Sequence, residues 1–349
     1  MNQQRLNSLR KHLKQRGLDA ALITNEVNVS YLSGLNAQAE LLITAGKKIA
    51  FVDFRYMEAA QRQLKSWQIW QRRSFYPIEE EIIQCATGLR LKRLGFEPLS
   101  LSFEGHRKLK AGIKPIKLVP ASGLIETLRA KKFPQEIRLI KQAASLAVKS
   151  MDYARKIVRP GVSELEVVRK LHYYMQDMGA QGPAFDIIIA SGPRSSMPHA
   201  AASARKIRNN EAVLVDLGCR ISGYNSDLTR MLFLGKISAK IKHIFTIVSR
   251  AQQLAIKAAR PGMKIKELDS IAREHIAQYG LGIYFGHSLG HGIGKQVHEY
   301  PSISPHSRDL LRTGMVFTIE PGIYIPKLGG FRQEDMVLLT PKGAKVLTG

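Results

Sequence analysis

The sequence predicts an α+β protein with two domains, an alternating α/β unit followed by a curved antiparallel sheet covered by helices. Up to about residue 120, short apolar strands alternate with helical patterns. Beyond that point, pairs of helices are followed by runs of strands, and this order occurs twice. A length of 349 residues, with 44% hydrophobic and 23% charged residues, suits two ordinary globular domains, which we place at residues 1–125 and 133–349.

The first domain is expected to begin with an amphipathic helix. Leu6, Leu9 and Leu13 recur at helical spacing, and Gly17 is suited to end the helix. Residues 28–34 have the composition of a turn-rich connection. Strands are predicted at 20–24, 41–44, 48–52, 94–96 and 117–119, and helices at 54–64, 78–89 and 104–110.

The pattern changes between Pro120 and Pro134, where we expect the domain boundary. Pro134 suits the first turn of a long helix, and Pro160–Gly161 would end that helix. Helices are predicted at 135–158, 163–178, 238–259 and 265–279, and strands at 185–190, 212–219, 229–234, 315–319, 322–325 and 335–339.

Composition limits the environment and the partners. The net charge of +25 is spread over both halves of the chain, without a recognised nucleic-acid-binding motif. We therefore expect a broadly basic surface and no specific nucleic acid partner. Two cysteines exclude a disulfide framework and favour a reducing, cytoplasmic location. No apolar run approaches the length that crosses a membrane, so no membrane partner is expected.

The chemistry is predicted to centre on residues 287–298, which contain three histidines. His291 is flanked by glycines, which would let the backbone or a substrate approach closely. Imidazole is the commonest protein ligand for transition metals. By itself, however, the stretch also fits a glycine-rich loop with ordinary surface or core histidines.

Four carboxylates in apolar, strand-like surroundings favour the metal interpretation, because unpaired buried charges are costly. Asp216 and Asp227 flank a turn at 221–225, and adjacent strands could present both on one face. A solvated surface hairpin is the alternative for this pair. Glu320 and Glu334 lie at the ends of other strands. Four oxygen ligands with His291 suit Mn²⁺, Fe²⁺, Co²⁺ or Zn²⁺, and two such ions could activate water and polarise a carbonyl.

These residues lie in five segments, namely 215–218, 226–230, 290–294, 320–324 and 332–335. The order and spacing of these segments resemble those of the pita-bread metallopeptidases. The chain is most similar to the Xaa-Pro aminopeptidases and Xaa-Pro dipeptidases, or prolidases, of that family. Residues 1–125 more loosely resemble the creatinase/prolidase-type N-terminal domain, through 17–20 and 31–34.

The resemblance implies a dinuclear site that hydrolyses the bond between an N-terminal residue and a following proline. Asp216 would bind one ion, His291 and Glu320 would bind the other, and Asp227 and Glu334 would bridge them. Glu320 would also carry a proton. The ions are expected to be Mn²⁺ or Co²⁺, with Zn²⁺ or Fe²⁺ as alternatives.

The same resemblance implies a substrate side built from histidines. His199, His287 and His298 would bind substrate and take part in catalysis, and Tyr324 and Arg332 would complete the binding site. Arg332 would also orient the neighbouring acids. Two departures, Lys295 and the segment 298–301, concern fine specificity and leave the metal ligands intact.

The expected partners are short peptides with proline at the second position and a second copy of the chain in a homodimer. Three other functions stay open for comparison. A methionine aminopeptidase would not need the first domain, and a creatine amidinohydrolase would not need the metal ligands. A non-catalytic binding protein on the same scaffold would gain nothing from clustered acids, which destabilise a fold that holds no metal.

Overall fold

The computed structural model describes residues 2–73 and 76–349, and the chain divides into two compact units, residues 1–128 and 129–349. Helix α6, Glu126–Ala130, crosses the division. Among the described residues, none of the helices combines the length and the apolar character needed to cross a lipid bilayer.

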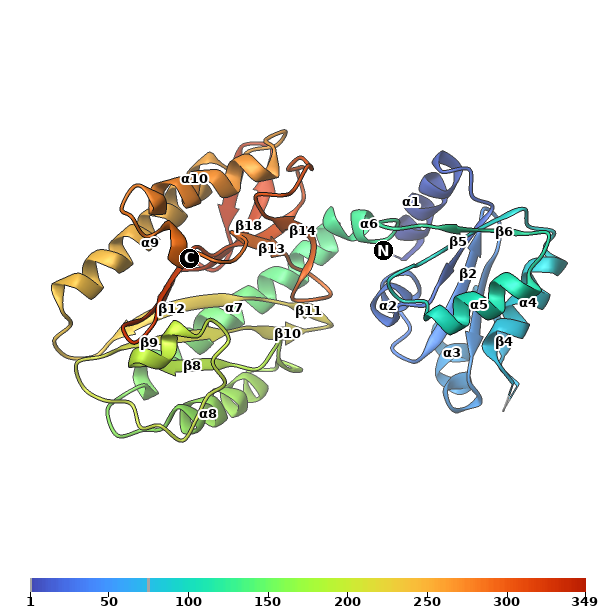
Figure 1. Cartoon of the computed structure of the whole chain (residues 1–349). Helices are drawn as coiled ribbons and strands as arrows, with labels where there is room; N and C mark the ends of the chain where they lie inside the picture. Colours follow the sequence, from blue (N-terminus) through green and yellow to red (C-terminus); the bar gives the residue numbers. More distant parts are fainter. Residues whose placement is uncertain (1, 74–75) are drawn as a thin grey trace. The chain divides into compact units, whose positions relative to one another are not determined.

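The first unit is a six-stranded sheet between two layers of helices (Figure 1). Alternate residues of a strand point to opposite faces. Ala21 and Ile23 therefore pack with helices α1, α2 and α3, whereas Ala20 and Leu22 pack with α4 and α5. The strand order is β4-β3-β2-β1-β5-β6, and β2 is antiparallel to both of its neighbours.

The helices of this unit are α1 (Asn2–Gln15), α2 (Glu26–Ser33), α3 (Met57–Gln63), α4 (Ile78–Gly88) and α5 (Phe103–Gly112). The strands are β1 (Ala20–Ile23), β2 (Ala39–Thr44), β3 (Lys48–Val52), β4 (Gln68–Gln71), β5 (Arg93–Phe96) and β6 (Lys117–Pro120). The amphipathic first helix is confirmed, with Leu6, Leu9 and Leu13 buried.

The prediction of a turn-rich connection at 28–34 is wrong, because α2 occupies most of it. The Asn25 side chain accepts a hydrogen bond from the Asn28 N–H at the start of this helix. Gly34, with a φ of 82°, ends it. These are ordinary capping residues at both ends of a short helix, and their turn-like composition concealed it. Strand β4 was not predicted.

The second unit has four long helices, namely α7 (Pro134–Ile157), α8 (Glu164–Asp177), α9 (Ala239–Ala258) and α10 (Ile265–Ala277). Pro134 occupies the first turn of α7, as predicted. Helices α7 and α8 pack against strands β8, β9 and β12, and α9 and α10 pack against β15 and β18 (Figure 1). The strands form antiparallel sheets in the orders β11-β10-β7, β12-β9-β8, β14-β13-β15-β18-β19 and β16-β17, and the helices cover them, as expected.

The first group of strands in this unit contains β7 (Gly182–Pro183), β8 (Ile188–Ser191), β9 (Ala212–Leu217), β10 (Cys219–Ile221), β11 (Tyr224–Asn225) and β12 (Leu228–Phe233). The second contains β13 (Gly290–Gly292), β14 (Glu299–Ile303), β15 (Val316–Ile319), β16 (Gly322–Ile325), β17 (Gly329–Arg332), β18 (Asp335–Thr340) and β19 (Gly343–Val346). The two groups meet where the Glu334 N–H donates to the Thr229 carbonyl, at 3.3 Å.

Both cysteines are free and buried, Cys85 in the first unit and Cys219 in the second. Cys219 Sγ lies 3.8 Å from Ser150 Oγ on α7. Burial raises the pKa of the Cys219 thiol to about 11 and also raises the pKa of the Cys85 thiol. Both side chains therefore act as small apolar core residues that stay protonated at neutral pH.

Candidate metal centre

The five predicted metal ligands come from strands of both groups in the second unit. Asp216 lies on β9, His291 lies on β13, and Glu320 directly follows β15. Asp227 directly precedes β12 and Glu334 directly precedes β18. The sheet therefore brings together residues that are more than 100 positions apart in the sequence.

The register of β9 and β12 explains why Asp216 and Asp227 share a face. Asp216 is paired with Thr229 across the two strands, and Asp227 lies two residues before Thr229. Because side chains alternate along a strand, positions 227 and 229 point the same way. Both aspartates are buried, as is Glu334, which is only 1% exposed.

His291 directs one ring nitrogen at the acids. Its Nδ1 lies 3.1 Å from the Gly292 carbonyl oxygen, which leaves Nε2 facing Asp227 Oδ2 at 3.6 Å and Glu320 Oε1 at 3.2 Å. Ligand atoms of Asp227, His291 and Glu334 all lie within 4.8 Å of one another. A backbone acceptor at one nitrogen, with the other directed at the site, is the usual arrangement of a metal-binding histidine.

The glycines around His291 allow the strands to approach closely. A Cβ atom at Gly290 would lie 2.1 Å from the Thr318 carbonyl oxygen, and one at Gly292 would lie 2.4 Å from the Tyr300 carbonyl oxygen. Neither contact can be relieved by a side-chain rotation, because both involve backbone atoms. Within the stretch 287–298, residues 290–292 form β13, and β14 begins directly after the stretch, at Glu299.

The acids are electrostatically unfavourable together unless a cation is present. Burial, with the charges of neighbouring acids, raises the pKa of Asp227 and of Glu334 well above the ordinary value. Burial also raises the pKa of Glu320, but the hydrogen bond and charge of His291 outweigh it and lower this pKa to about 2. Within the described residues, Asp216 Oδ1 and Glu334 Oε1 are buried without a hydrogen-bond partner. Two buried carboxylate oxygens left in this way fit a site for divalent cations.

Arg332 occupies the centre of a buried hydrogen-bond network beside the acids. Its guanidinium donates to Asp216 Oδ2, to the Tyr324 hydroxyl at 2.7 Å and to Thr229 Oγ1 at 3.1 Å. A planar group with several N–H donors can serve all three acceptors at once. The Pro198 carbonyl oxygen is a fourth acceptor, at 3.3 Å.

Two threonines that the sequence analysis did not single out hold the candidate ligands in place. Thr229 Oγ1 donates to Glu334 Oε2 at 2.7 Å. Thr318 Oγ1 donates to Glu320 Oε1 and accepts from the His291 N–H, both at 3.1 Å. Thr229 lies two residues after Asp227, and Thr318 lies two residues before Glu320. A hydroxyl at that spacing shares a strand face with the acid, and this signal was available in the sequence.

The three remaining histidines differ in how they are held. His287 Nδ1 lies 2.8 Å from the Ser288 carbonyl oxygen, and His287 Nε2 lies 3.1 Å from the Tyr324 hydroxyl. Burial raises the pKa of Tyr324 to about 12, so its hydroxyl stays protonated. His199 and His298 are exposed, and the His298 ring centroid lies 4.2 Å from that of His291. Substrate could therefore reach His199 and His298 directly, whereas contact with His287 Nε2 would displace Tyr324.

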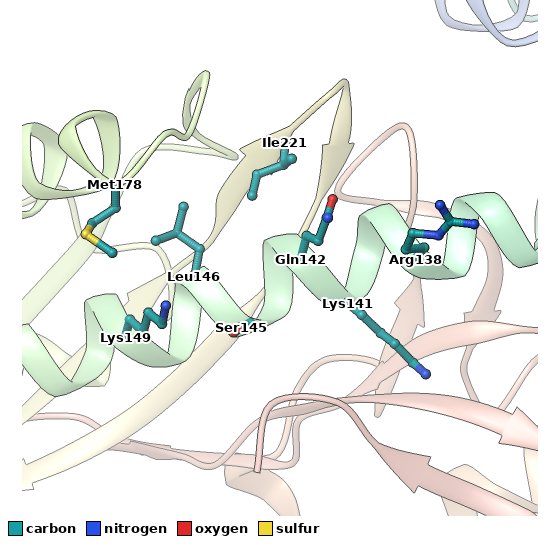
Figure 2. Close-up of a pocket in the computed structure, with 8 residues that line it drawn as sticks. All are labelled: Arg138, Lys141, Gln142, Ser145, Leu146, Lys149, Met178 and Ile221. Atoms are coloured by element: carbon teal, nitrogen blue, oxygen red, sulfur yellow. The ribbon is translucent and has the colours of Figure 1, made fainter.

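A separate hollow of about 410 Å³ lies along the outer side of α7 (Figure 2). Arg138, Lys141 and Lys149 line it, together with apolar side chains that include Leu146 and Met178. None of the predicted site residues lines this hollow. It is therefore not part of the candidate metal centre.

The raised pKa values of Asp227 and Glu334 predict how metal binding depends on pH. Without metal, these two carboxyls stay protonated in the folded protein at pH values at which the same carboxyls of the unfolded chain have lost their protons. The free energy of unfolding of the metal-free protein therefore falls as the pH rises from the ordinary carboxyl pKa toward the raised pKa of the folded protein. Metal must displace those protons. The rise in thermal unfolding midpoint on adding Mn²⁺ should therefore be larger at about pH 8 than at about pH 5.5. An equal rise in the unfolding midpoint at the two pH values would contradict this prediction. The Asp227→Asn variant should show little rise in the midpoint at either pH.

Comparisons with known proteins agree with this geometry. Residues 138–341 match the model of metallopeptidase family M24, and residues 5–131 match the creatinase/prolidase N-terminal domain. A Xaa-Pro dipeptidase of Pyrococcus horikoshii is 41% identical over 353 residues, which cover 99% of this chain and 97% of the relative. The structure of a Xaa-Pro dipeptidase from Bacillus anthracis has a TM-score of 0.94 at 37% identity, covering 100% and 98% of the two chains. An X-Pro aminopeptidase structure from Thermotoga maritima has a TM-score of 0.86 at 32% identity, covering 97% of each.

Proposed function

Because the chain belongs to metallopeptidase family M24 and is therefore a metal-dependent peptide hydrolase, we propose that it cleaves the bond between an N-terminal residue and a following proline. The observation that carries this proposal is the cluster of Asp227, His291 and Glu334, beside which Glu320 lies 3.2 Å from the His291 ring. Two buried carboxylate oxygens, Asp216 Oδ1 and Glu334 Oε1, lack a hydrogen-bond partner among the described residues. The names of the similar proteins support proline at the second position.

The ligand set proposed for two divalent ions is Asp216, Asp227, His291, Glu320 and Glu334. Four carboxylates and a single imidazole favour Mn²⁺ or Co²⁺, with Zn²⁺ or Fe²⁺ as alternatives. When bound, the ions would supply polarisation of the scissile carbonyl and activation of water. Burial and the charges of neighbouring acids raise the pKa values of Asp227 and Glu334, so these two acids would gain most from bound cations.

Glu320 is the proposed proton carrier, because the resemblance to the family implies this role and its carboxylate lies in the ligand cluster, where bound water would be activated. Its Oε1 atom already accepts hydrogen bonds from Thr318, and His291 Nε2 lies beside it. Arg332 is proposed to hold Asp216 and Tyr324 in position, so that the binding wall keeps its shape during turnover.

Proline at the second position makes the scissile bond a tertiary amide that has no N–H to donate. A peptidase for this bond must recognise the shape of the ring and orient the carbonyl with side-chain donors. His199 and His298 are exposed and available for this task, and His287 with Tyr324 would form a more rigid wall. The histidines are therefore proposed to bind substrate and to stabilise the developing oxyanion.

A panel of four peptides, assayed with Mn²⁺ and with Co²⁺, tests the proposal. We expect cleavage of Ala-Pro, Ala-Pro-Ala or both, and roughly 10–200-fold slower cleavage of Ala-Ala-Ala, because its smaller second residue leaves the ring position unfilled. The two Xaa-Pro dipeptidases described above are 41% and 37% identical to this chain and the aminopeptidase is 32% identical, so Ala-Pro is the first substrate to test.

The panel also separates the alternatives. Preference for Met-Ala-Ala would identify a methionine aminopeptidase activity, and inactivity on all four peptides with metal bound would favour a binding protein. A matched assay after dialysis against a chelator should lose all activity and regain it when metal is restored. We further propose a homodimer, which the molar mass in solution by light scattering would test.

A further inference from the structure

A buried carboxylate held by two cations lies next to the predicted substrate-binding histidine, outside the proposed metal ligands. Glu299 Oε1 is 2.7 Å from Lys132 Nζ, and Glu299 Oε2 is 2.5 Å from Arg129 Nη2. The side chains of Arg129 and Glu299 are each 4% exposed, and that of Lys132 is 1% exposed. Burial would raise the pKa of Glu299, but the two cations outweigh it and lower the value. Glu299 is therefore an ionised carboxylate in a fully buried cluster, which we call the Glu299 clamp.

The Glu299 clamp organises the segment 294–299. Arg129 Nη2 donates to Gln296 Oε1 at 2.8 Å, and the Gln296 N–H donates to Glu299 Oε2 at 3.4 Å. The Gly294 N–H donates to the Gln296 carbonyl at 3.0 Å. A Cβ atom at Gly294 would lie 2.6 Å from Glu299 Oε1, so the chain folds directly against the carboxylate. The main chain on both sides of His298 is thus fixed by one buried cluster.

His298 itself has little else to hold it. Its side chain is exposed, and its ring has no hydrogen-bond partner within residues 2–73 and 76–349. Its ring lies beside that of His291, with centroids 4.2 Å apart. Glu299 follows it directly, begins β14 and is paired with Gly292 across the β13–β14 ladder. The position of the His298 ring therefore depends on the backbone that the Glu299 clamp fixes.

We propose that Glu299 is a positioning residue for the peptidase reaction. Held by Arg129 and Lys132, it fixes the main chain of 296–299 so that the His298 ring is presented beside His291. The inference rests on the proposed function, because it acts through the role given there to His298. Stability alone does not require a buried ion cluster, because apolar side chains of similar volume often stabilise a protein core as well as buried ion pairs do.

A double-mutant cycle tests this positioning role. Glu299→Gln keeps the shape of the side chain and removes the charge that the two cations require. We expect it to lower kcat roughly tenfold while KM and metal affinity stay nearly unchanged, as for other residues that orient active-site groups. In the background of His298→Ala, Glu299→Gln should cause no further loss of kcat, because the group that it positions is already absent.

Glu211→Gln is the matched control, because Glu211 also pairs with an arginine, Arg205, at 2.7 Å, away from segment 294–299. It should lower the thermal unfolding midpoint without changing kcat. If Glu299→Gln does not fold, Lys132→Met is the second variant, because it leaves Glu299 paired with Arg129 alone. Lys132→Met should lower kcat less than Glu299→Gln, and this loss should also disappear in the background of His298→Ala.

Independent, additive losses from Glu299→Gln and His298→Ala would overturn the positioning role and leave the proposed function standing. The wild-type enzyme assayed on the peptide panel decides the proposed function separately. If His298→Ala left kcat unchanged in an enzyme that cleaves Ala-Pro, the positioning role would also fail.

Discussion

Replacing Asp227 or Glu334 with alanine will abolish turnover and lower the metal content of the purified protein. Each residue lies among the other acids, is at most 5% exposed and belongs to the cluster whose ligand atoms lie within 4.8 Å of one another. Loss of metal removes several kcal/mol of transition-state stabilisation, which corresponds to a fall in kcat of roughly a thousandfold or more. Elemental analysis and steady-state kinetics on the same preparations measure both effects.

Asp335→Asn is the control for this experiment. Asp335 is the neighbour of Glu334 and is also buried, but its carboxylate pairs with Arg230 at 2.7 Å and accepts from Gln252 at 2.8 Å. The Asp335→Asn variant should be less stable than the wild-type protein and should keep its metal. Unchanged metal content together with full activity in Asp227→Ala or Glu334→Ala would refute the ligand assignment.

The second large effect is expected at Arg332, where Arg332→Met should destabilise the fold by about 3–5 kcal/mol. The substitution leaves the buried Asp216 carboxylate without its cation and leaves the Tyr324 hydroxyl and Thr229 Oγ1 without a donor. Arg332→Lys should recover only part of the loss, because one ammonium group cannot reproduce the planar geometry that reaches all three. Chemical denaturation of the metal-free proteins measures the free energy of unfolding.

Removal of both charges should restore much of the stability. In Asp216→Asn combined with Arg332→Met, no uncompensated charge is left buried, so the double variant should be more stable than Arg332→Met alone. If the losses simply add, Arg332 stabilises the fold through packing alone and does not neutralise Asp216.

The fold class and the elements with strong periodicity were predictable from the sequence. The amphipathic spacing of Leu6, Leu9 and Leu13 and the proline at the start of α7 are local signals, and the structure confirms both. Short elements without such signals were missed. Helix α2 is stabilised by its caps and by burial against the sheet, and β13 is a strand because two neighbours pair with it. Those causes lie in the tertiary structure.

The candidate ligands were found because charged residues in apolar surroundings are conspicuous in sequence. The residues that orient them were harder to find. Thr229 and Thr318 are ordinary strand residues until the register places each beside an acid. The sequence analysis did not single out Glu299 as a positioning residue, because its two cations are about 170 positions earlier in the chain. Partners at that separation become visible only when the strands are assembled.

The state of the two cysteines has a practical bearing on how metal occupancy can be studied. Neither thiol is accessible, and the pKa of Cys219 near 11 leaves almost no thiolate at neutral pH. Oxidation and alkylation proceed through the thiolate, so both reactions will be slow in the folded protein. The enzyme can therefore be purified and loaded without dithiothreitol or mercaptoethanol. Thiolates of those reductants are themselves ligands for zinc and other transition metals, and their omission means that the protein competes for the added ion with buffer alone.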